Sequence, residues 1–260
     1  MKKLLATLSV AALAGMASLA PAMAQPLKVG ISAEPYPPFT VPDAAGNWTG
    51  WEVDFAKTVC EEAKLDCVIT PLAWDGIIPA LNAGKIDMII TSMSITNDRL
   101  KTIDFTDSYY KSKSAVIGAK DMQFDATPEG LKDKVIGVQV GTRHLFYAQK
   151  HFAPAGATLR EYQTQDEANN DLVAGRIDAI EADDIAMKDF LNTEAGKACC
   201  DMKGTVVDDQ DVLADGAGIG LRKSDTELKE KLNTAIKGIR ANGKYAEFNK
   251  KYFDFDIFGD

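Results

Sequence analysis

The chain has 260 residues, of which 46% are hydrophobic and 8% aromatic, and its formal net charge is −9. This composition is typical of a folded globular protein and excludes a disordered chain. An acidic chain without a cluster of Lys and Arg is not expected to bind nucleic acid.

Residues 1–24 have the pattern of a cleavable export signal. Two lysines precede an apolar run over 4–20, and Ala22-Met23-Ala24 has the small-residue spacing of a cleavage site. We expect this signal to direct export across the inner membrane and to be cleaved after Ala24. An uncleaved anchor helix is the alternative. No Cys follows the cleavage site to carry a lipid anchor, and no later run reaches the roughly 18 apolar residues of a membrane span.

The four cysteines form two pairs. Cys60 and Cys67 lie at the end of a predicted helix and the start of a predicted strand, so an oxidising compartment favours a disulfide between them. Cys199 and Cys200 are adjacent and bond only through a strained ring, so their state stays open. Neither of the two histidines is spaced with a Cys pair, and we expect no metal site.

Predicted strands and helices alternate along the chain, which favours parallel sheets covered by helices. The pattern predicts strands at 27–31, 67–71, 86–90, 114–118, 134–138, 158–162, 177–180 and 218–221, and helices at 51–63, 74–82, 143–151, 166–174, 184–192, 224–242 and 245–252.

The strand predicted over 86–90 runs into a polar segment. Three hydroxyls follow it, those of Thr91, Ser92 and Ser94, and Arg99 lies in the first turn of a predicted helix. A guanidinium beside unpaired backbone N–H groups favours an anion such as a carboxylate. The alternative is a polar loop with Arg99 facing solvent.

An internal repeat relates two parts of the chain. Residues 81–89 recur as 172–180, and in both copies a helix is expected to end at a Gly before a strand begins. Chance similarity of two such turns is the alternative.

The repeat predicts a ligand cleft, because open parallel sheets bind ligands beyond the carboxyl ends of their strands. Hydroxyls and Arg99 on one unit then face Glu181, Asp183 and Asp184 on the other. A small zwitterion such as an α-amino acid fits this arrangement. The alternative role of Asp183 and Asp184 is helix capping, and we expect one of the two to cap.

Two aromatic residues follow the first two strands. Tyr36 lies in Tyr36-Pro37-Pro38-Phe39, a loop stiffened by proline, and Trp74 follows the second strand. Rings at these strand ends can stack on a ligand, although each alone is equally compatible with packing.

At this point the chain resembles the periplasmic solute-binding proteins of the polar amino-acid uptake family, especially the lysine/arginine/ornithine- and histidine-binding members. The resemblance covers essentially all of 25–260. The motifs that carry it are Tyr36-Pro37-Pro38-Phe39, Gly50-Trp51-Glu52-Val53-Asp54, the Cys60/Cys67 pair, Ser92-Met93-Ser94-Ile95-Thr96 with Arg99, Asp104-Phe105-Thr106, Val138-Gln139-Val140-Gly141-Thr142, Ala174-Gly175-Arg176-Ile177-Asp178 and Lys251-Tyr252-Phe253-Asp254-Phe255-Asp256.

The resemblance implies ligand contacts for the residues already identified. Arg99 pairs with the ligand α-carboxylate, helped by Ser94 and the backbone around Thr142-Arg143, and Asp183 with Ser92 binds the α-ammonium. The remaining implied contacts are the rings of Tyr36 and Trp74 around the ligand side chain, and Thr91, Gln139, Arg143 and His144.

The resemblance also implies a two-lobed α/β fold of the type II periplasmic binding proteins, with parallel or mixed sheets and two crossing hinge segments near 109–114 and 208–214. Lobe 1 is expected at 25–110 and 213–260, and lobe 2 at 111–212. The implied protein is a periplasmic monomer without a cofactor, which closes around its ligand and is recognised by an inner-membrane ABC permease with its ATPase.

One departure concerns the ligand side chain. Relatives that bind cationic side chains commonly carry an acid where this chain has Ala33, and Glu34 is the residue expected to replace it. If Glu34 does not replace this acid, the side-chain pocket is neutral and a neutral amino acid is the alternative ligand. Arg143 stands where relatives often have Thr, and its charge favours an opine-like conjugate with a second acceptor as a further alternative. A cyclohexadienyl-dehydratase-like enzyme on the same fold, using Asp183, Glu181 or His144, is the less favoured alternative.

Overall fold

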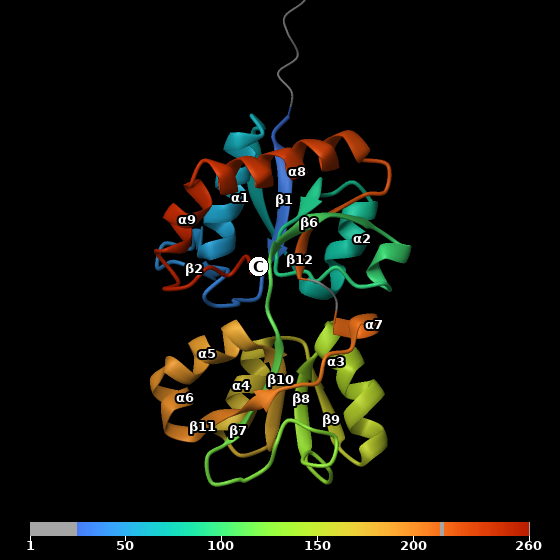
Figure 1. The fold of residues 1–260 in the computed structure, drawn as a ribbon, viewed down its shortest axis with the longest axis vertical. Helices are drawn as coiled ribbons and strands as arrows, with labels where there is room; N and C mark the ends of the chain where they lie inside the picture. The colour runs from blue at the N-terminus through green and yellow to red at the C-terminus, as the bar shows by residue number, and fades with distance from the viewer. Residues whose placement is uncertain (1–24, 214–215, 260) are drawn as a thin grey trace, which may run out of the picture.

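The computed structural model describes residues 25–213 and 216–259 and consists of two α/β lobes, one above the other in Figure 1. The expected fold class is confirmed, and the predicted signal segment lies outside the described residues. The strands are β1 (Leu27–Ser32), β2 (Val41–Pro42), β3 (Trp48–Thr49), β4 (Cys67–Leu72), β5 (Met88–Ile89), β6 (Asp104–Tyr110), β7 (Ser114–Ala119), β8 (Val135–Gln139), β9 (Thr158–Tyr162), β10 (Ala179–Asp183), β11 (Cys200–Thr205) and β12 (Ala217–Leu221).

Helices flank both sheets. In Figure 1, α8 runs along the end of the first lobe that is remote from the second, and α3 and α5 lie on opposite sides of the second lobe. Within the described ranges, no helix is long and apolar enough to cross a membrane. The helices are α1 (Trp51–Glu62), α2 (Ile77–Asn82), α3 (Arg143–Tyr147), α4 (Gln165–Val173), α5 (Asp184–Asn192), α6 (Glu194–Cys199), α7 (Gln210–Leu213), α8 (Thr226–Ala241) and α9 (Lys244–Asn249).

Both main sheets are mixed rather than wholly parallel. The first has the order β4-β1-β5-β12-β6, in which β12 runs antiparallel to both of its neighbours. The second has the order β11-β7-β10-β8-β9, in which β7 runs antiparallel to β10 and β11. The chain passes from the first sheet to the second between β6 and β7, and returns between α7 and β12. Each lobe is therefore completed by strands that lie next to a crossing.

Several predicted elements differ from those observed. β6 and β11 were not predicted, because both are edge strands with several polar residues and no clean alternation. The strand predicted over 86–90 is reduced to Met88–Ile89, the two residues that pair with β1, and β12 pairs with it at Ile89 alone. The helix predicted over 143–151 stops at Tyr147 and continues as a wider π turn. These differences leave the order of the elements around the cleft unchanged.

The two repeat copies adopt the same local conformation. Gly84 and Gly175 follow α2 and α4, and both have left-handed backbone angles, with φ of 69° and 67°. A side chain is unfavourable in this region, so Gly is the natural residue for ending the helix there. The strands that follow, β5 and β10, both have their carboxyl ends at the cleft.

Both cysteine pairs are disulfides in the structure. Cys60 and Cys67 are joined as expected, which ties the end of α1 to the start of β4. Cys199 and Cys200, whose state the sequence left open, are also bonded, at the junction of α6 and β11.

The Cys60–Cys67 bond is expected to stabilise the native state, because it removes the closure entropy of a short loop from the unfolded chain. The double substitution Cys60→Ala/Cys67→Ala should lower the free energy of unfolding by roughly 2–3 kcal/mol for a sequence separation of 7. Urea denaturation of both proteins measures this difference. An unchanged unfolding midpoint would show that the bond does not contribute in this way.

Candidate ligand-binding site

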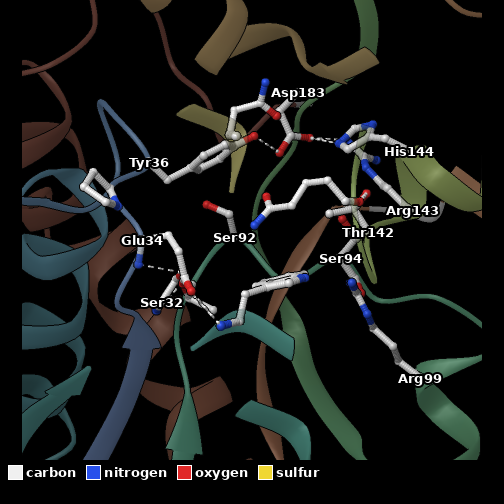
Figure 2. A pocket seen from close by; sticks show the side chains of 15 residues that line it. Ser32, Glu34, Tyr36, Ser92, Ser94, Arg99, Thr142, Arg143, His144 and Asp183 are labelled. Atoms are coloured by element: carbon white, nitrogen blue, oxygen red, sulfur yellow. Dashed lines mark hydrogen bonds and ion pairs between the residues drawn. The ribbon is translucent and has the colours of Figure 1, made fainter. Parts of the chain in front are cut away.

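One pocket lies between the lobes, and all the ligand-contact residues predicted from the sequence line it (Figure 2). The first lobe contributes the segments that follow β1, β4 and β5, and the second contributes the ends of β8 and β10 and the start of α3. Ser32, Pro35 and Gln165 line it too, and the sequence analysis had not singled them out. The predicted residues that it brings together are Glu34, Tyr36, Trp74, Thr91, Ser92, Ser94, Arg99, Gln139, Thr142, Arg143, His144 and Asp183.

Arg99 provides a buried cation at one end of the pocket. Its side chain donates to the backbone oxygens of Ser94, at 2.9 Å, and Gly141, at 3.0 Å, and its guanidinium carbon lies 5.4 Å from the centre of the Trp74 ring. Burial, together with the charge of Arg143, lowers the pKa of Arg99 to about 10, so it remains charged at neutral pH. Two of its five N–H groups are used in these hydrogen bonds, and the fork geometry suits a carboxylate.

The helix expected around Arg99 is a single 3-10 turn, Arg99–Lys101. Thr96 accepts a hydrogen bond from the Arg99 backbone N–H through its hydroxyl, which fixes the start of this turn. One short turn has little dipole, so the attraction for an anion here comes from the guanidinium itself.

Asp183 provides the opposite charge. It accepts hydrogen bonds from the Tyr36 hydroxyl, at 2.8 Å, and from Arg143, at 2.6 Å, and His144 Nε2 lies 3.4 Å away. Burial alone would raise the pKa of this carboxyl, but Arg143 and His144 hold it below its ordinary value. Figure 2 shows Tyr36 and Asp183 pointing at each other across the pocket.

The expectation that Asp183 or Asp184 caps the following helix is wrong. Asp183 occupies the N-cap position of α5, but its side chain makes no capping bond because it is engaged with Arg143 and Tyr36. Asp184 instead accepts from the hydroxyl of Ser112 and pairs with Lys188. Of the three acids predicted at this edge, Asp183 alone is among the pocket residues.

Arg143 and His144 are largely occupied by the protein itself. Arg143 is buried and donates to the backbone oxygens of Leu213, at 2.6 Å, and Ser112, at 2.8 Å, as well as to Asp183. It therefore joins both crossings to the second lobe. Its positive charge is balanced by Asp183 and does not act as a free cation in the pocket.

A row of buried polar groups lies behind the pocket. Ser114 donates to Glu181 at 2.6 Å and lies 2.7 Å from His144 Nδ1. Although burial favours the neutral imidazole, the Asp183 carboxylate raises the pKa of His144. Glu181, which the repeat had placed in the cleft, is wholly buried in this row because its carboxylate faces Ser114 and His144.

Glu34 lies in the pocket on the side of Trp74. Its carboxylate accepts the Trp74 backbone N–H at 3.2 Å and the hydroxyl of Ser32. These bonds hold an acidic group beside an aromatic ring, one residue after Ala33. The part of the pocket beside Trp74 therefore has a carboxylate, although this chain has Ala33 where relatives commonly carry an acid.

Glu52 is the buried acid that the sequence analysis did not single out. It lies in the first turn of α1, is 1% exposed and accepts from the Ser92 backbone N–H and the Tyr109 hydroxyl, both at 2.5 Å. An acid within the apolar run Trp51-Glu52-Val53 was the available signal, because a charge on the buried face of a helix needs a partner.

Direct hydrogen bonds join the lobes around the pocket. Tyr36 bonds Asp183, Trp74 Nε1 donates to the Val140 oxygen at 3.0 Å, and Arg99 donates to the Gly141 oxygen. No group of three His, Cys, Asp or Glu residues suitable for a metal ion occurs among residues 25–213 and 216–259. The arrangement can hold a small molecule with a carboxylate at Arg99, an ammonium at Asp183 and an extended part between the rings.

Known proteins are similar to this chain in sequence and in fold. Residues 27–255 match the family model described as bacterial extracellular solute-binding proteins, family 3. The chain is 40% identical to the L-arginine-binding protein of Pseudomonas aeruginosa, with 100% of this chain and 99% of that protein aligned. It is 41% identical to the histidine-binding periplasmic protein of Salmonella typhimurium, with 100% of both aligned.

A solved structure agrees with the sequence matches. An ancestral arginine-binding protein bound to arginine has a TM-score of 0.79 at 32% identity, covering 87% of this chain and 97% of that one. Because the family model spans most of the chain and the relatives align along their whole length, the chain belongs to the bacterial extracellular solute-binding proteins, family 3.

Proposed function

We propose that the protein is the periplasmic ligand-binding component of an ABC uptake transporter for a basic amino acid such as arginine, lysine, ornithine or histidine. The observation that carries this proposal is the pair of buried opposite charges, Arg99 and Asp183, at separate parts of one pocket between two lobes. Relatives of 40–41% identity are named as arginine- and histidine-binding proteins, which supports the ligand class and a receptor rather than an enzyme.

The α-carboxylate of the ligand pairs with Arg99, helped by Ser94 and by Thr142 at the start of α3. The α-ammonium binds between Asp183 and Ser92. Since Arg99 is charged and Asp183 is ionised at neutral pH, both contacts are charge-assisted hydrogen bonds.

The ligand side chain extends between the rings of Tyr36 and Trp74 towards Glu34. A cationic side chain gains both from the Glu34 carboxylate and from the ring faces. Thr91, Gln139 and His144 complete the proposed contacts, with Arg143 acting through Asp183.

The lobes proposed from the sequence are 25–110 with 213–260, and 111–212, and they close about the two crossings. Cleavage after Ala24, a monomeric state and recognition of the closed form by an inner-membrane permease with its ATPase belong to the same proposal. No cofactor or nucleic acid takes part in it.

The alternative ligands have less support. An opine-like conjugate would need a cation in the pocket to bind its second carboxylate. Arg143 does not supply one, because its N–H groups donate to Asp183, Ser112 and Leu213. A neutral amino acid would leave Glu34 without a charged partner. For a dehydratase-like enzyme, the acid or base would be Asp183, Glu181 or His144. Asp183 is engaged with Arg143 and Tyr36, His144 with Ser114, and Glu181 is wholly buried and is not among the pocket residues.

A thermal-shift screen tests the proposal. The protein is denatured, freed of bound ligand and refolded, then heated with single L-amino acids. A ligand that binds the native state raises the melting temperature by mass action, and we expect the largest shifts with basic amino acids. Shifts confined to neutral or conjugated amino acids would replace the ligand class, and no shift with any amino acid would contradict the function.

Arg99→Ala removes the partner of the ligand carboxylate and should weaken binding of L-arginine by about 2–5 kcal/mol, roughly 30-fold to several thousand-fold. Isothermal titration calorimetry measures the change. Lys101→Ala is the matched control, because it removes a cation from the same turn whose side chain is 74% exposed. Equal affinities of Arg99→Ala and the wild type would refute the carboxylate contact.

Glu34→Gln keeps the shape of the side chain but removes the charge proposed to face the ligand side chain. Affinity for arginine and lysine should fall about 10-fold to 150-fold, the range for a hydrogen bond to a charged group. Asp75→Asn serves as the control, since Asp75 is an exposed acid on the turn that carries Trp74. Equal affinity of the variant and the wild type for arginine would show that the ligand side chain does not contact Glu34.

A further inference from the structure

Glu52 lies directly behind a residue of the pocket without lining the pocket itself. Its Oε1 accepts the Ser92 backbone N–H, its Oε2 accepts the Ser92 hydroxyl at 3.0 Å, and the Tyr109 hydroxyl donates to Oε1. Ser92 is the residue that separates this carboxylate from the pocket. The contacts to the backbone and the side chain of Ser92 together fix its orientation.

The backbone of Ser92 is held in an uncommon conformation. Its φ is 52°, in the left-handed region where residues other than Gly are disfavoured by about 1 kcal/mol or more. Such a conformation persists only where the surroundings determine it. The Ser92 N–H bond to Glu52 supplies that determination, because it points the amide away from the pocket and towards α1.

The same contact sets the polarity of the Ser92 hydroxyl. A serine hydroxyl has one proton to donate, and here that proton is used in the bond to Glu52. The Tyr110 hydroxyl also lies within hydrogen-bond distance of Ser92 Oγ, and the oxygen has a further lone pair to accept from a donor in the pocket. A ligand ammonium is such a donor, and Asp183 lies across the pocket as its counter-ion.

We propose that Glu52 is a positioning residue for the ammonium-binding site: it presets Ser92 as an acceptor and links binding of the ligand ammonium to its own ionisation. This inference rests on the proposed function, since it needs a ligand that carries an ammonium group. Glu52 acts through Ser92 and does not touch the ligand.

The groups around Glu52 determine the direction of the linkage. Burial raises the pKa of Glu52 to about 7, against the lowering effect of the bonds from Tyr109 and Ser92, and the charge of Asp183 raises it further. Burial keeps the pKa values of Tyr109 and Tyr110, the neighbouring hydroxyls on β6, well above their ordinary value, so both stay neutral. The carboxyl therefore titrates in the neutral range.

A ligand ammonium held on Ser92 favours the ionised form of Glu52 and lowers its pKa in the complex. Binding then releases a proton at pH values near 7. The affinity must rise with pH through the pKa of the free protein and level off above it. At lower pH the carboxyl is protonated before the ligand arrives, and binding is weaker.

The test is isothermal titration calorimetry of the full mature chain with L-arginine and L-lysine between pH 5.5 and 8.5. Each pH is measured in two buffers of different ionisation enthalpy, which counts the protons released. We expect affinity about tenfold lower at pH 5.5 than at pH 8, and release of about half a proton between pH 6 and 7. Binding without proton release or pH dependence would overturn this inference alone, whereas no binding at any pH would overturn the proposed function as well.

His144 also titrates near the ligand, because the Asp183 carboxylate raises its pKa, so a variant must assign the effect. Glu52→Gln keeps the shape of the side chain without the ionisation, and it should bind more weakly at pH 8 and lose most of the pH dependence. A full pH slope in Glu52→Gln would assign the linkage to the second lobe and overturn the proposal. Should this variant not fold, Tyr109→Phe removes one donor to Glu52 and must move the midpoint of the profile to higher pH; an unmoved midpoint would count against Glu52.

Discussion

The ion pair between Arg143 and Asp183 is the contact on which the site depends. A buried charge is tolerated only when it is paired and hydrogen-bonded, and here each group is paired with the other and hydrogen-bonded to further groups. Arg143 also donates to backbone oxygens on both crossings, so the positions of the crossings and of the Asp183 carboxylate are set together. One guanidinium therefore holds both the Asp183 carboxylate of the pocket and the backbone of the two crossings.

This constraint explains why the other groups can be arranged so simply. With Asp183 fixed from the second lobe, the first lobe needs only to present Tyr36 to it and to place Arg99 against the oxygen of Gly141. Tyr36 lies in the segment that follows β1, and Arg99 lies in the segment that follows β5. Tyr36 and Asp183, although distant in the chain, come within hydrogen-bond distance because the carboxyl ends of strands from both sheets meet at the pocket.

The sequence was informative where local chemistry and position coincide. Hydroxyls and Arg99 after a buried strand, an acid after the repeated strand and two rings at strand ends were predicted from the residues, and the resemblance added Gln139, Thr142, Arg143 and His144. Ser32, Pro35 and Gln165 were not predicted. The sequence was uninformative where a partner comes from far along the chain. Nothing near Arg143 indicates that its side chain turns towards Ser112 and Leu213, and β6 and β11 are formed by pairing rather than by their own patterns. For the same reason, the sequence could not show whether the Asp183 side chain faces the pocket or caps the following helix.

The charges of the pocket can be counted once these partners are known. Arg143 and Asp183 cancel, which leaves Arg99 and Glu34 as the opposite charges on the first lobe. A zwitterion with a cationic side chain matches Arg99 with its carboxylate and Glu34 with its side chain, while its ammonium adds a second cation beside Asp183. A further negative group offsets that extra positive charge, and the buried carboxylate of Glu52, which accepts from Ser92, can supply it from the first lobe. Glu52 on α1 thus supplies the negative charge that the residues lining the pocket lack for a ligand with two cationic groups.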